Sequence, residues 1–250
     1  MPGPVRYATI GCGAGDRPDG TADGLGNTVT WSGEPSVPIE PSVPIAAMVG
    51  DPLEDEYRAV RSRVSLGGLP RLSRAVTERI ICASGDLTFA ADLACAEPAL
   101  EAAVLALDSG APVVADGPMV SAGIADFPVV CKSGESLTRR LARTAGIELA
   151  AAAVRLAFGE VGPGAVWVVG SEPVAIYEIL ARGTEPVLVI GMPAGFVAAV
   201  GAKAALRESS VPALTNVCEK GGPAAAVAGC RALLDEVRAL RGELRAGLGS

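Results

Sequence analysis

The segment Pro186-Val-Leu-Val-Ile-Gly-Met-Pro-Ala-Gly-Phe-Val197 decides the fold. Its first part, residues 186–190, is a continuous apolar run that does not alternate between apolar and polar positions. Such a run is typical of a strand that is covered on both faces, as in a parallel sheet. A Gly/Pro turn follows, and then a helix is expected over residues 196–208. The segment therefore predicts one strand–turn–helix unit.

The same unit recurs on both sides of this segment. Further apolar strands are expected at residues 112–115, 128–131, 165–169 and 212–217. Helices are expected at residues 52–65, 70–82, 97–109, 118–123, 136–158, 173–181 and from 223 onward, and an extended segment at 86–93. This alternation predicts an α/β fold, with a doubly wound, mostly parallel sheet and helices on both faces. Ligands of such sheets bind at the carboxyl ends of the strands, which here carry the loops 116–118, 132–134, 170–173, 191–195 and 220–222.

The first fifty residues differ in composition from the rest. They are rich in Gly and Pro and contain a tandem hexapeptide, Glu34-Pro-Ser-Val-Pro-Ile39, which is repeated at residues 40–45. Prolines at this spacing prevent a helix. Gly11, Gly13 and Gly15 resemble a dinucleotide-binding loop, but no amphipathic helix follows them. We therefore predict a turn-rich extension over residues 1–50 and one α/β domain over residues 51–250.

Composition and charge exclude several classes of protein. Half of the 250 residues are hydrophobic and 20% are charged, which is typical of a folded chain. The formal net charge is −7, so no overall basic field would attract nucleic acid. The most apolar stretch, residues 187–202, is interrupted by three glycines and Pro193. No membrane span is therefore expected.

The sequence contains no histidine, which excludes a Ser-His-Asp triad and a histidine-ligated zinc site. Its six cysteines form no C-x-x-C pair, so no metal site is expected. The chain does not open with a signal-peptide pattern, and we expect a cytoplasmic protein with reduced thiols.

Together the loops resemble the precorrin-8X methylmutase family of cobalamin biosynthesis. The resemblance runs from about Tyr57 to the last helix. It is most specific in Val189-Ile-Gly-Met-Pro-Ala-Gly-Phe-Val197 with Lys203 following. Further matches are Asp116-x-x-Met119-Val120-x-x-Gly123-Ile124, Gly170-x-x-Pro173, Lys220-Gly-Gly222 and Arg79-Ile-Ile-Cys82-Ala-Ser-Gly85.

The resemblance implies an isomerase that is a homodimer with a flavodoxin-like sheet. Its small-molecule substrate would be a tetrapyrrole or another acidic metabolite, held in a pocket that the partner subunit lines in part. The implied reaction is an acid-assisted shift of a methyl group between adjacent ring carbons, and it needs no cofactor.

The resemblance also implies which residues form the site. Cys82 falls where the family has its catalytic histidine and would be the proton donor, although a cysteine in a helix is also a common small core residue. The implied substrate-binding residues are Tyr57, Arg58, Asp116, Lys132, Ser133, Thr144, Ser171, Pro193, Gly195, Lys220, Gly221 and Gly222. For Asp116 stabilisation of its own turn is an alternative, and for Lys132 and Ser133 the alternative is a solvated surface.

The sequence departs from the family pattern at several polar positions. Val60 replaces a serine, Ala145 replaces the arginine of a Thr-Arg-Ser turn, and Val217 stands where an arginine precedes the Gly-Gly pair. Each lost charge-assisted hydrogen bond would remove about 1.5–3 kcal/mol of interaction. These changes favour a different or less acidic substrate, in a member recruited to another pathway. The alternative is a non-catalytic tetrapyrrole-binding module or a chaperone for a pathway partner.

Overall fold

The computed structural model of the protein describes residues 52–248. The predicted N-terminal extension and its hexapeptide repeat lie outside these residues. Within them, no helix combines the length and the hydropathy that a membrane crossing requires.

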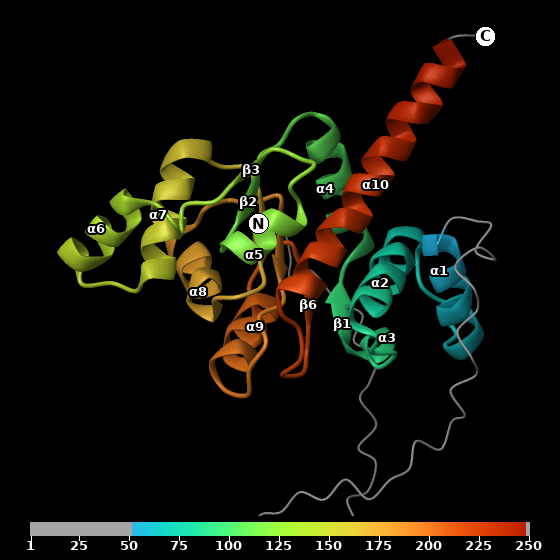
Figure 1. Cartoon of the computed structure of the whole chain (residues 1–250), viewed down its shortest axis with the longest axis horizontal. Helices are drawn as coiled ribbons and strands as arrows, with labels where there is room; N and C mark the ends of the chain where they lie inside the picture. The colour runs from blue at the N-terminus through green and yellow to red at the C-terminus, as the bar shows by residue number, and fades with distance from the viewer. Residues whose placement is uncertain (1–51, 249–250) are drawn as a thin grey trace, which may run out of the picture.

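Six strands form one sheet in the order β1-β6-β5-β4-β2-β3 (Figure 1). The strands are β1 (Leu93–Cys95), β2 (Val113–Ala115), β3 (Val129–Val130), β4 (Val166–Val169), β5 (Leu188–Gly191) and β6 (Ala213–Asn216). All neighbouring pairs are parallel except β1 and β6, which pair Leu93 with Asn216 in antiparallel register. Without β1, the strand order is the flavodoxin-like 2-1-3-4-5, whose topological switch point lies between β2 and β4. The predicted doubly wound, mostly parallel sheet is confirmed.

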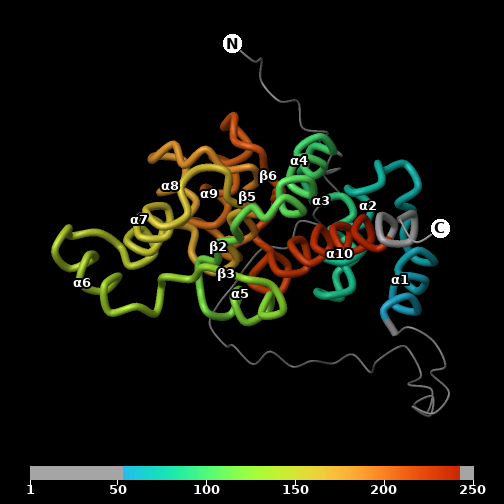
Figure 2. The backbone as a smooth tube through the Cα atoms, turned by 90° about the horizontal axis from the view of Figure 1, so that it is seen from above, coloured from blue at the N-terminus to red at the C-terminus, as the bar shows by residue number. Residues whose placement is uncertain are grey.

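Helices cover both faces of the sheet (Figure 2). One face packs against α2 (Arg71–Ser84), α4 (Glu97–Asp108), α5 (Pro118–Gly123) and α10 (Pro223–Leu248). The other packs against α7 (Leu149–Val161), α8 (Pro173–Arg182) and α9 (Ala198–Glu208). Along β4, Val166 and Val168 face the first layer, whereas Trp167 and Val169 face the second. This explains the continuous apolar strands, because both faces of each strand are covered.

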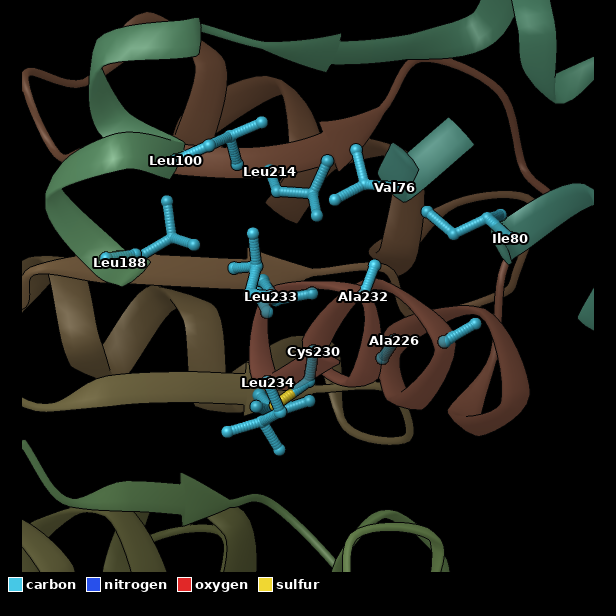
Figure 3. Close-up of a cluster of buried hydrophobic side chains, with 14 of the residues drawn as sticks. Val76, Ile80, Leu100, Leu188, Leu214, Ala226, Cys230, Ala232, Leu233 and Leu234 are labelled. Atoms are coloured by element: carbon cyan, nitrogen blue, oxygen red, sulfur yellow. The ribbon is translucent and has the colours of Figure 1, made fainter. Parts of the chain in front are cut away.

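The larger core lies between the sheet and the helices α2, α4 and α10 (Figure 3). Ile80 of α2, Leu100 of α4 and Leu233 of α10 are fully buried there, together with Leu188 and Leu214 from the strands. Burial of a side chain of this size contributes about 1.5–3 kcal/mol. The outer helix α1 (Pro52–Arg63) packs on α2.

Several predicted boundaries are confirmed and others are wrong. Helix α2 begins after Pro70 and ends at Gly85, which has φ 68°, as the sequence predicts. The single helix predicted over residues 136–158 is instead two helices, α6 (Ser136–Ala145) and α7, because Gly146 takes a left-handed conformation with φ 62°. The strand or extended segment predicted at residues 86–93 is wrong in part, since half of it is the short helix α3 (Phe89–Asp92) and only Leu93 belongs to a strand.

Candidate functional site

The loops that follow β2, β4, β5 and β6 meet at the carboxyl end of the sheet. We call them the mouth loops: residues 116–118, 170–172, 192–197 and 217–222. Helices α2 and α10 run antiparallel, so the end of α2 also reaches this edge. Arg71 pairs with Glu236 at one end of the two helices, and Asp86 pairs with Lys220 at the other.

The first feature of the site is a carboxylate at the switch point. Oδ2 of Asp116 accepts hydrogen bonds from the backbone N–H groups of Gly170 at 3.1 Å, Ser171 at 2.7 Å and Glu172 at 2.9 Å. We call this arrangement the Asp116 clamp. The other oxygen, Oδ1, is buried and has no hydrogen-bond partner. Burial raises the pKa of Asp116, although the three N–H groups oppose that change.

The contacts of Asp116 extend beyond its own turn. The carboxylate holds the loop that leads into α8, rather than only its own turn. It also occupies the N–H groups before α8, where a flavodoxin-like fold would otherwise bind a phosphate. This geometry argues against a nucleotide at the switch point.

The second feature is a buried lysine under the loop that follows β6. The Nζ atom of Lys203 donates to Oδ1 of Asn216 at 3.1 Å, to the carbonyl oxygen of Lys220 at 2.8 Å and to that of Cys218. We call this arrangement the Lys203 clamp. Lys203 is fully buried, and burial lowers its pKa to about 8 against the opposing charge of Asp92.

Asp92 holds the same loop from the other side. Its Oδ1 accepts the N–H groups of Val217 at 3.1 Å and Cys218 at 2.9 Å, and its Oδ2 accepts Nδ2 of Asn216 at 2.9 Å. Burial alone would raise the pKa of Asp92, but the hydrogen bonds from Cys218 and Asn216 and the charge of Lys220 hold it below its ordinary value. The loop is therefore fixed by buried ions and not by its own turn alone.

Two mouth loops lock onto each other through their glycines. Gly221 has φ 145°, and a Cβ atom there would lie 2.3 Å from the carbonyl oxygen of Met192. That oxygen accepts the N–H of Gly222 at 2.6 Å, and the N–H of Gly195 donates to the carbonyl oxygen of Glu219 at 2.8 Å. The backbone approach at this point is possible only for glycine.

The structure thus brings part of the predicted site together. Asp116, Ser171, Pro193, Gly195, Lys220, Gly221 and Gly222 all lie on the mouth loops. Lys220, however, is held by Asp86 at 3.2 Å and by the hydroxyl group of Thr88, and its Nζ lies 4.2 Å from the ring centroid of Phe89. Its ammonium group is therefore already paired.

Other predicted residues lie at the edges of the molecule. Lys132 follows β3, the outer strand, and pairs with Glu135 at 2.9 Å and Glu160 at 2.5 Å. The Oγ atom of Ser133 lies 3.4 Å from Sγ of Cys131. Thr144 is exposed on α6, which packs on α7 and projects at one end of the molecule (Figure 1).

The residues predicted on α1 lie beside α2. The hydroxyl group of Tyr57 accepts a hydrogen bond from Arg79 at 3.2 Å and lines a cavity of about 330 Å³ between α1, α2 and α10. Burial raises the pKa of Tyr57. Arg58 is exposed and pairs with Asp55 at 2.9 Å.

Cys82 lies near the mouth end of α2. It is half-buried against the larger core and is not among the residues that line the α1–α2–α10 cavity. Burial raises the pKa of its thiol, and the negative charges of Glu56 and Glu78 act in the same direction. The thiol therefore keeps its proton at neutral pH.

A second cavity, of about 520 Å³, opens beside the mouth loops. It lies between α5 and β3 and is lined in part by Pro118, Ser121, Cys131 and Gly134. Within residues 52–248, no group of three or more Cys, Asp or Glu side chains is arranged to hold a metal ion.

Sequence reasoning missed the roles of Asp92, Asn216 and Lys203. Lys203 belongs to the motif that begins at Val189, but its position in the sequence does not reveal that it lies under the loop after β6. Asn216 offers a signal, because β6 ends in two buried polar residues, Thr215 and Asn216. Asp92 offered none, since its role depends on the antiparallel pairing of β1 with β6.

The chain is similar to known proteins over most of its described length. The family model described as precorrin-8X methylmutase matches residues 53–236. The cobalt-precorrin-8 methylmutase of Methanocaldococcus jannaschii is 33% identical over 157 residues, which cover 61% of this chain and 74% of that protein. The precorrin-8X methylmutase of Pseudomonas aeruginosa is 31% identical over 192 residues, which cover 72% of this chain and 92% of that protein. A solved precorrin-8X methylmutase from Thermus thermophilus matches with a TM-score of 0.66 and 30% identity, covering 74% of this chain and 96% of that one.

Proposed function

Because the chain belongs to the precorrin-8X methylmutase family, we propose that it is an isomerase that shifts a methyl group between adjacent carbons of a tetrapyrrole ring. The observation that carries this proposal is the match over residues 53–236, which includes every mouth loop. The glycine contacts between residues 192–197 and 217–222 and the two clamps keep these loops in one fixed arrangement. A fixed site favours a rearrangement in which the substrate only has to be held in one geometry.

The proposed chemistry needs one proton donor. A proton delivered to the macrocycle before the methyl shift and returned afterwards leaves the composition of the product equal to that of the substrate. We assign this role to Cys82, which is protonated at neutral pH and lies on the part of α2 that ends at the mouth loops. Its raised pKa makes it a weaker acid than the imidazolium of a histidine.

Substitution of Cys82 tests this assignment. With precorrin-8X as the substrate, we expect Cys82→Ala to lower kcat by about 10²-fold, the smaller end of the range for general acid catalysis. Cys82→His should raise kcat above that of the wild type, because it supplies the stronger acid. Cys230→Ala is the matched control, since this thiol is buried in the core on α10. Turnover that is unchanged in Cys82→Ala would remove the thiol from the mechanism.

We further propose which residues form the pocket. Ser171, Gly221 and Gly222 are proposed pocket residues because they lie on the loops that the two clamps hold. Pro193 and Gly195 join them because the glycine contacts hold their loop against residues 217–222. We propose that the enzyme is cytoplasmic and uses no redox cofactor.

We also propose a homodimer that meets at the mouth loops. Phe196 and Val197 are 85% and 84% exposed there, and Met119 is 69% exposed. Exposed apolar side chains at one edge of the sheet favour burial against a second surface. Sedimentation velocity should give a dimer for the wild type and a monomer for Phe196→Ser with Val197→Ser. Leu105→Ser, at an exposed apolar residue on α4, should leave the dimer intact.

The alternative is a tetrapyrrole-binding module without turnover. It is favoured by the weak acidity of Cys82 and by the paired state of Lys220. Tight binding of hydrogenobyrinate by a chain that never converts precorrin-8X would support this alternative over the enzyme.

A further inference from the structure

The side chain of Tyr57 is held at both ends in the α1–α2–α10 cavity, between three helices that lie together (Figure 2). The guanidinium group of Arg61 lies 5.7 Å from the centroid of its ring, and Nη1 of Arg79 donates to its hydroxyl oxygen at 3.2 Å. Arg61 is bound in turn by both carboxylate oxygens of Glu78, at 2.9 and 2.8 Å. Arg79 pairs with Asp235 of α10 at 3.1 Å. Each arginine that contacts Tyr57 is therefore fixed by a carboxylate from another helix.

The hydroxyl group of Tyr57 has a proton to donate. Its oxygen accepts the hydrogen bond from Arg79, and among residues 52–248 no acceptor takes the phenolic proton. A guanidinium group has no acceptor, so the O–H bond points away from Arg79. Burial raises the pKa of Tyr57 although the hydrogen bond from Arg79 lowers it, and the hydroxyl group stays protonated at neutral pH. Tyr57 is thus a neutral donor whose direction Arg79 sets.

The carboxylates around this hydroxyl group are all neutralised by arginines. The lining of the cavity contains Glu54, Glu78, Asp235 and Glu236, and each of them forms an ion pair with an arginine. A carboxylate of a ligand therefore meets no unpaired carboxylate among the described residues of this cavity. A hydrogen bond from a neutral phenol to such a charged oxygen is stronger than one to a neutral acceptor.

The same side of α2 carries the proposed proton donor. Arg79 and Cys82 lie three residues apart on this helix, so their side chains are neighbours. Burial and the charge of Glu56 raise the pKa of Cys82, and the charge of Arg79 opposes them. Arg79 therefore acts on the thiol of Cys82 and on the hydroxyl group of Tyr57 together. We expect a substrate that reaches Cys82 to lie within reach of Tyr57 as well.

We propose that Arg79 is a positioning residue, which orients the hydroxyl group of Tyr57 to donate a hydrogen bond to a carboxylate or carbonyl oxygen on a side arm of the substrate. This inference rests on the proposed function and deepens it, because it names the residue that sets one contact with the substrate. Arg79 does not touch the substrate, and Asp235 keeps its guanidinium group in place. The side arm takes no part in the methyl shift, so no bond in it forms or breaks.

Steady-state kinetics of the full chain with precorrin-8X test the inference. A hydrogen bond to an arm that does not react is equally strong in the bound substrate and in the transition state. Its loss therefore raises KM and leaves kcat unchanged. We expect Tyr57→Phe to raise KM about tenfold and Arg79→Met to raise it about fivefold. This pattern differs from that expected for Cys82→Ala, which should lower kcat.

Two further variants separate positioning from a purely structural role. Arg79→Met in the Tyr57→Phe background should raise KM no further, because Arg79 acts through the hydroxyl group. Arg79→Lys should restore most of the wild-type KM, since an ammonium group can still donate to Tyr57. The loss of Arg79 does not leave Asp235 unpaired, because Arg238 remains bound to it at 2.6 Å.

The matched controls remove the same groups elsewhere. Arg241→Met breaks an ion pair that joins α10 to another helix, through Asp108 of α4 at 2.6 Å, and it involves no tyrosine. Tyr177→Phe removes the hydroxyl group of an exposed tyrosine on α8. Both variants should keep the KM of the wild type.

The outcomes distinguish this inference from the proposed function. The inference is overturned, and the methylmutase function stands, if the wild type converts precorrin-8X while Arg79→Met keeps its KM. The same conclusion follows if the rise in KM persists in the Tyr57→Phe background. Should Arg79→Met fail to fold, which circular dichroism would report, a wild-type KM in Tyr57→Phe would also overturn the inference. A wild type that neither binds nor converts precorrin-8X would overturn the proposed function, and the inference with it.

Discussion

The Asp116 clamp and the Lys203 clamp each hold a loop that follows a strand, one with a buried carboxylate and the other with a buried ammonium group. At the switch point, the loop after β4 directs its N–H groups inward, and the carboxylate of Asp116 accepts three of them. After β6, the loop directs carbonyl oxygens inward, and the ammonium group of Lys203 donates to two of them. In both cases a buried ion satisfies backbone groups that have left the strands. A charged residue at a ligand-binding edge can therefore serve the scaffold and not the ligand.

The difference between the clamps lies in how completely each ion is satisfied. Lys203 has three acceptors, and the carboxylate of Asp92 supports the same loop. Asp116 leaves one oxygen without a partner. The Lys203 clamp should therefore contribute more to stability than the Asp116 clamp.

Substitution of Lys203 should cause the largest loss in the free energy of unfolding. Lys203→Met keeps most of the side-chain volume but removes the ammonium donor from the carbonyl groups of Cys218 and Lys220, to which only Nδ2 of Asn216 then still donates. We expect a loss of about 3–5 kcal/mol in the free energy of unfolding, as for a buried charge whose partner is removed. Urea denaturation followed by circular dichroism measures this loss. A loss below that of Asp116→Asn would reverse the proposed ranking of the clamps.

The pH dependence of stability provides a second test of the Lys203→Met variant. Lys203 has a pKa of about 8 in the folded chain and regains its ordinary value of 10.5 on unfolding. Between these values the unfolded chain binds the proton and the folded chain does not, so the contribution of Lys203 to stability rises with pH. The difference in free energy of unfolding between the wild type and Lys203→Met should therefore grow from pH 8 to pH 10.

Substitution of Gly221, whose backbone contacts Met192 beside the Lys203 clamp, should cause the next largest loss in the free energy of unfolding. Gly221→Ala would place Cβ 2.3 Å from the carbonyl oxygen of Met192, at φ 145°. Strain and overpacking together predict a loss of about 2–4 kcal/mol. Gly222→Ala is the matched control, since φ is 107° but no atom lies within 4 Å of its Cβ position. Thermal unfolding should place Gly222→Ala between the wild type and Gly221→Ala, and equal losses would show that the contact with Met192 does not matter.

Substitution of Asp116 should lower the free energy of unfolding less than substitution of Lys203 or Gly221. In Asp116→Asn the side-chain oxygen can still accept the three N–H groups, but the charge is lost and an amide group replaces the orphaned oxygen. We expect a loss of about 1–3 kcal/mol in the same urea experiment. Asp116→Ala should lose more, because no acceptor remains for the loop after β4. If both variants were as stable as the wild type, the carboxylate would not be holding that loop.

The comparison also shows which parts of the molecule could be predicted from the sequence. Local signals determine the strands, α2 and its end at Gly85, because apolar runs, Pro70 and a left-handed glycine act within a few residues. The break at Gly146 was missed, since an isolated glycine does not by itself end a helix and both flanking segments are good helix formers. At the site, the glycines of the mouth loops follow from the motif. The partners of Lys132 and Lys220 do not, because Glu160 and Asp86 reach them only through the packing of separate elements.

Substitution of Lys220 should cause the smallest loss in the free energy of unfolding. Its comparison with Lys203 separates the contribution of a partly exposed lysine from that of a buried one. Lys220 belongs to the same loop as the Lys203 clamp, but its side chain is 22% exposed and bonds Asp86 and Thr88 near the surface. Partly exposed ion pairs and a cation–π contact contribute little, so Lys220→Met should lose only about 1 kcal/mol of unfolding free energy. Its partner variant Asp86→Asn should lose a similar amount, and the double variant should lose less than the sum of the two because they share one interaction. A loss for Lys220→Met that equals that of Lys203→Met would mean that exposure does not distinguish the two lysines. The loop after β6 would then depend on its surface charges as much as on the buried one.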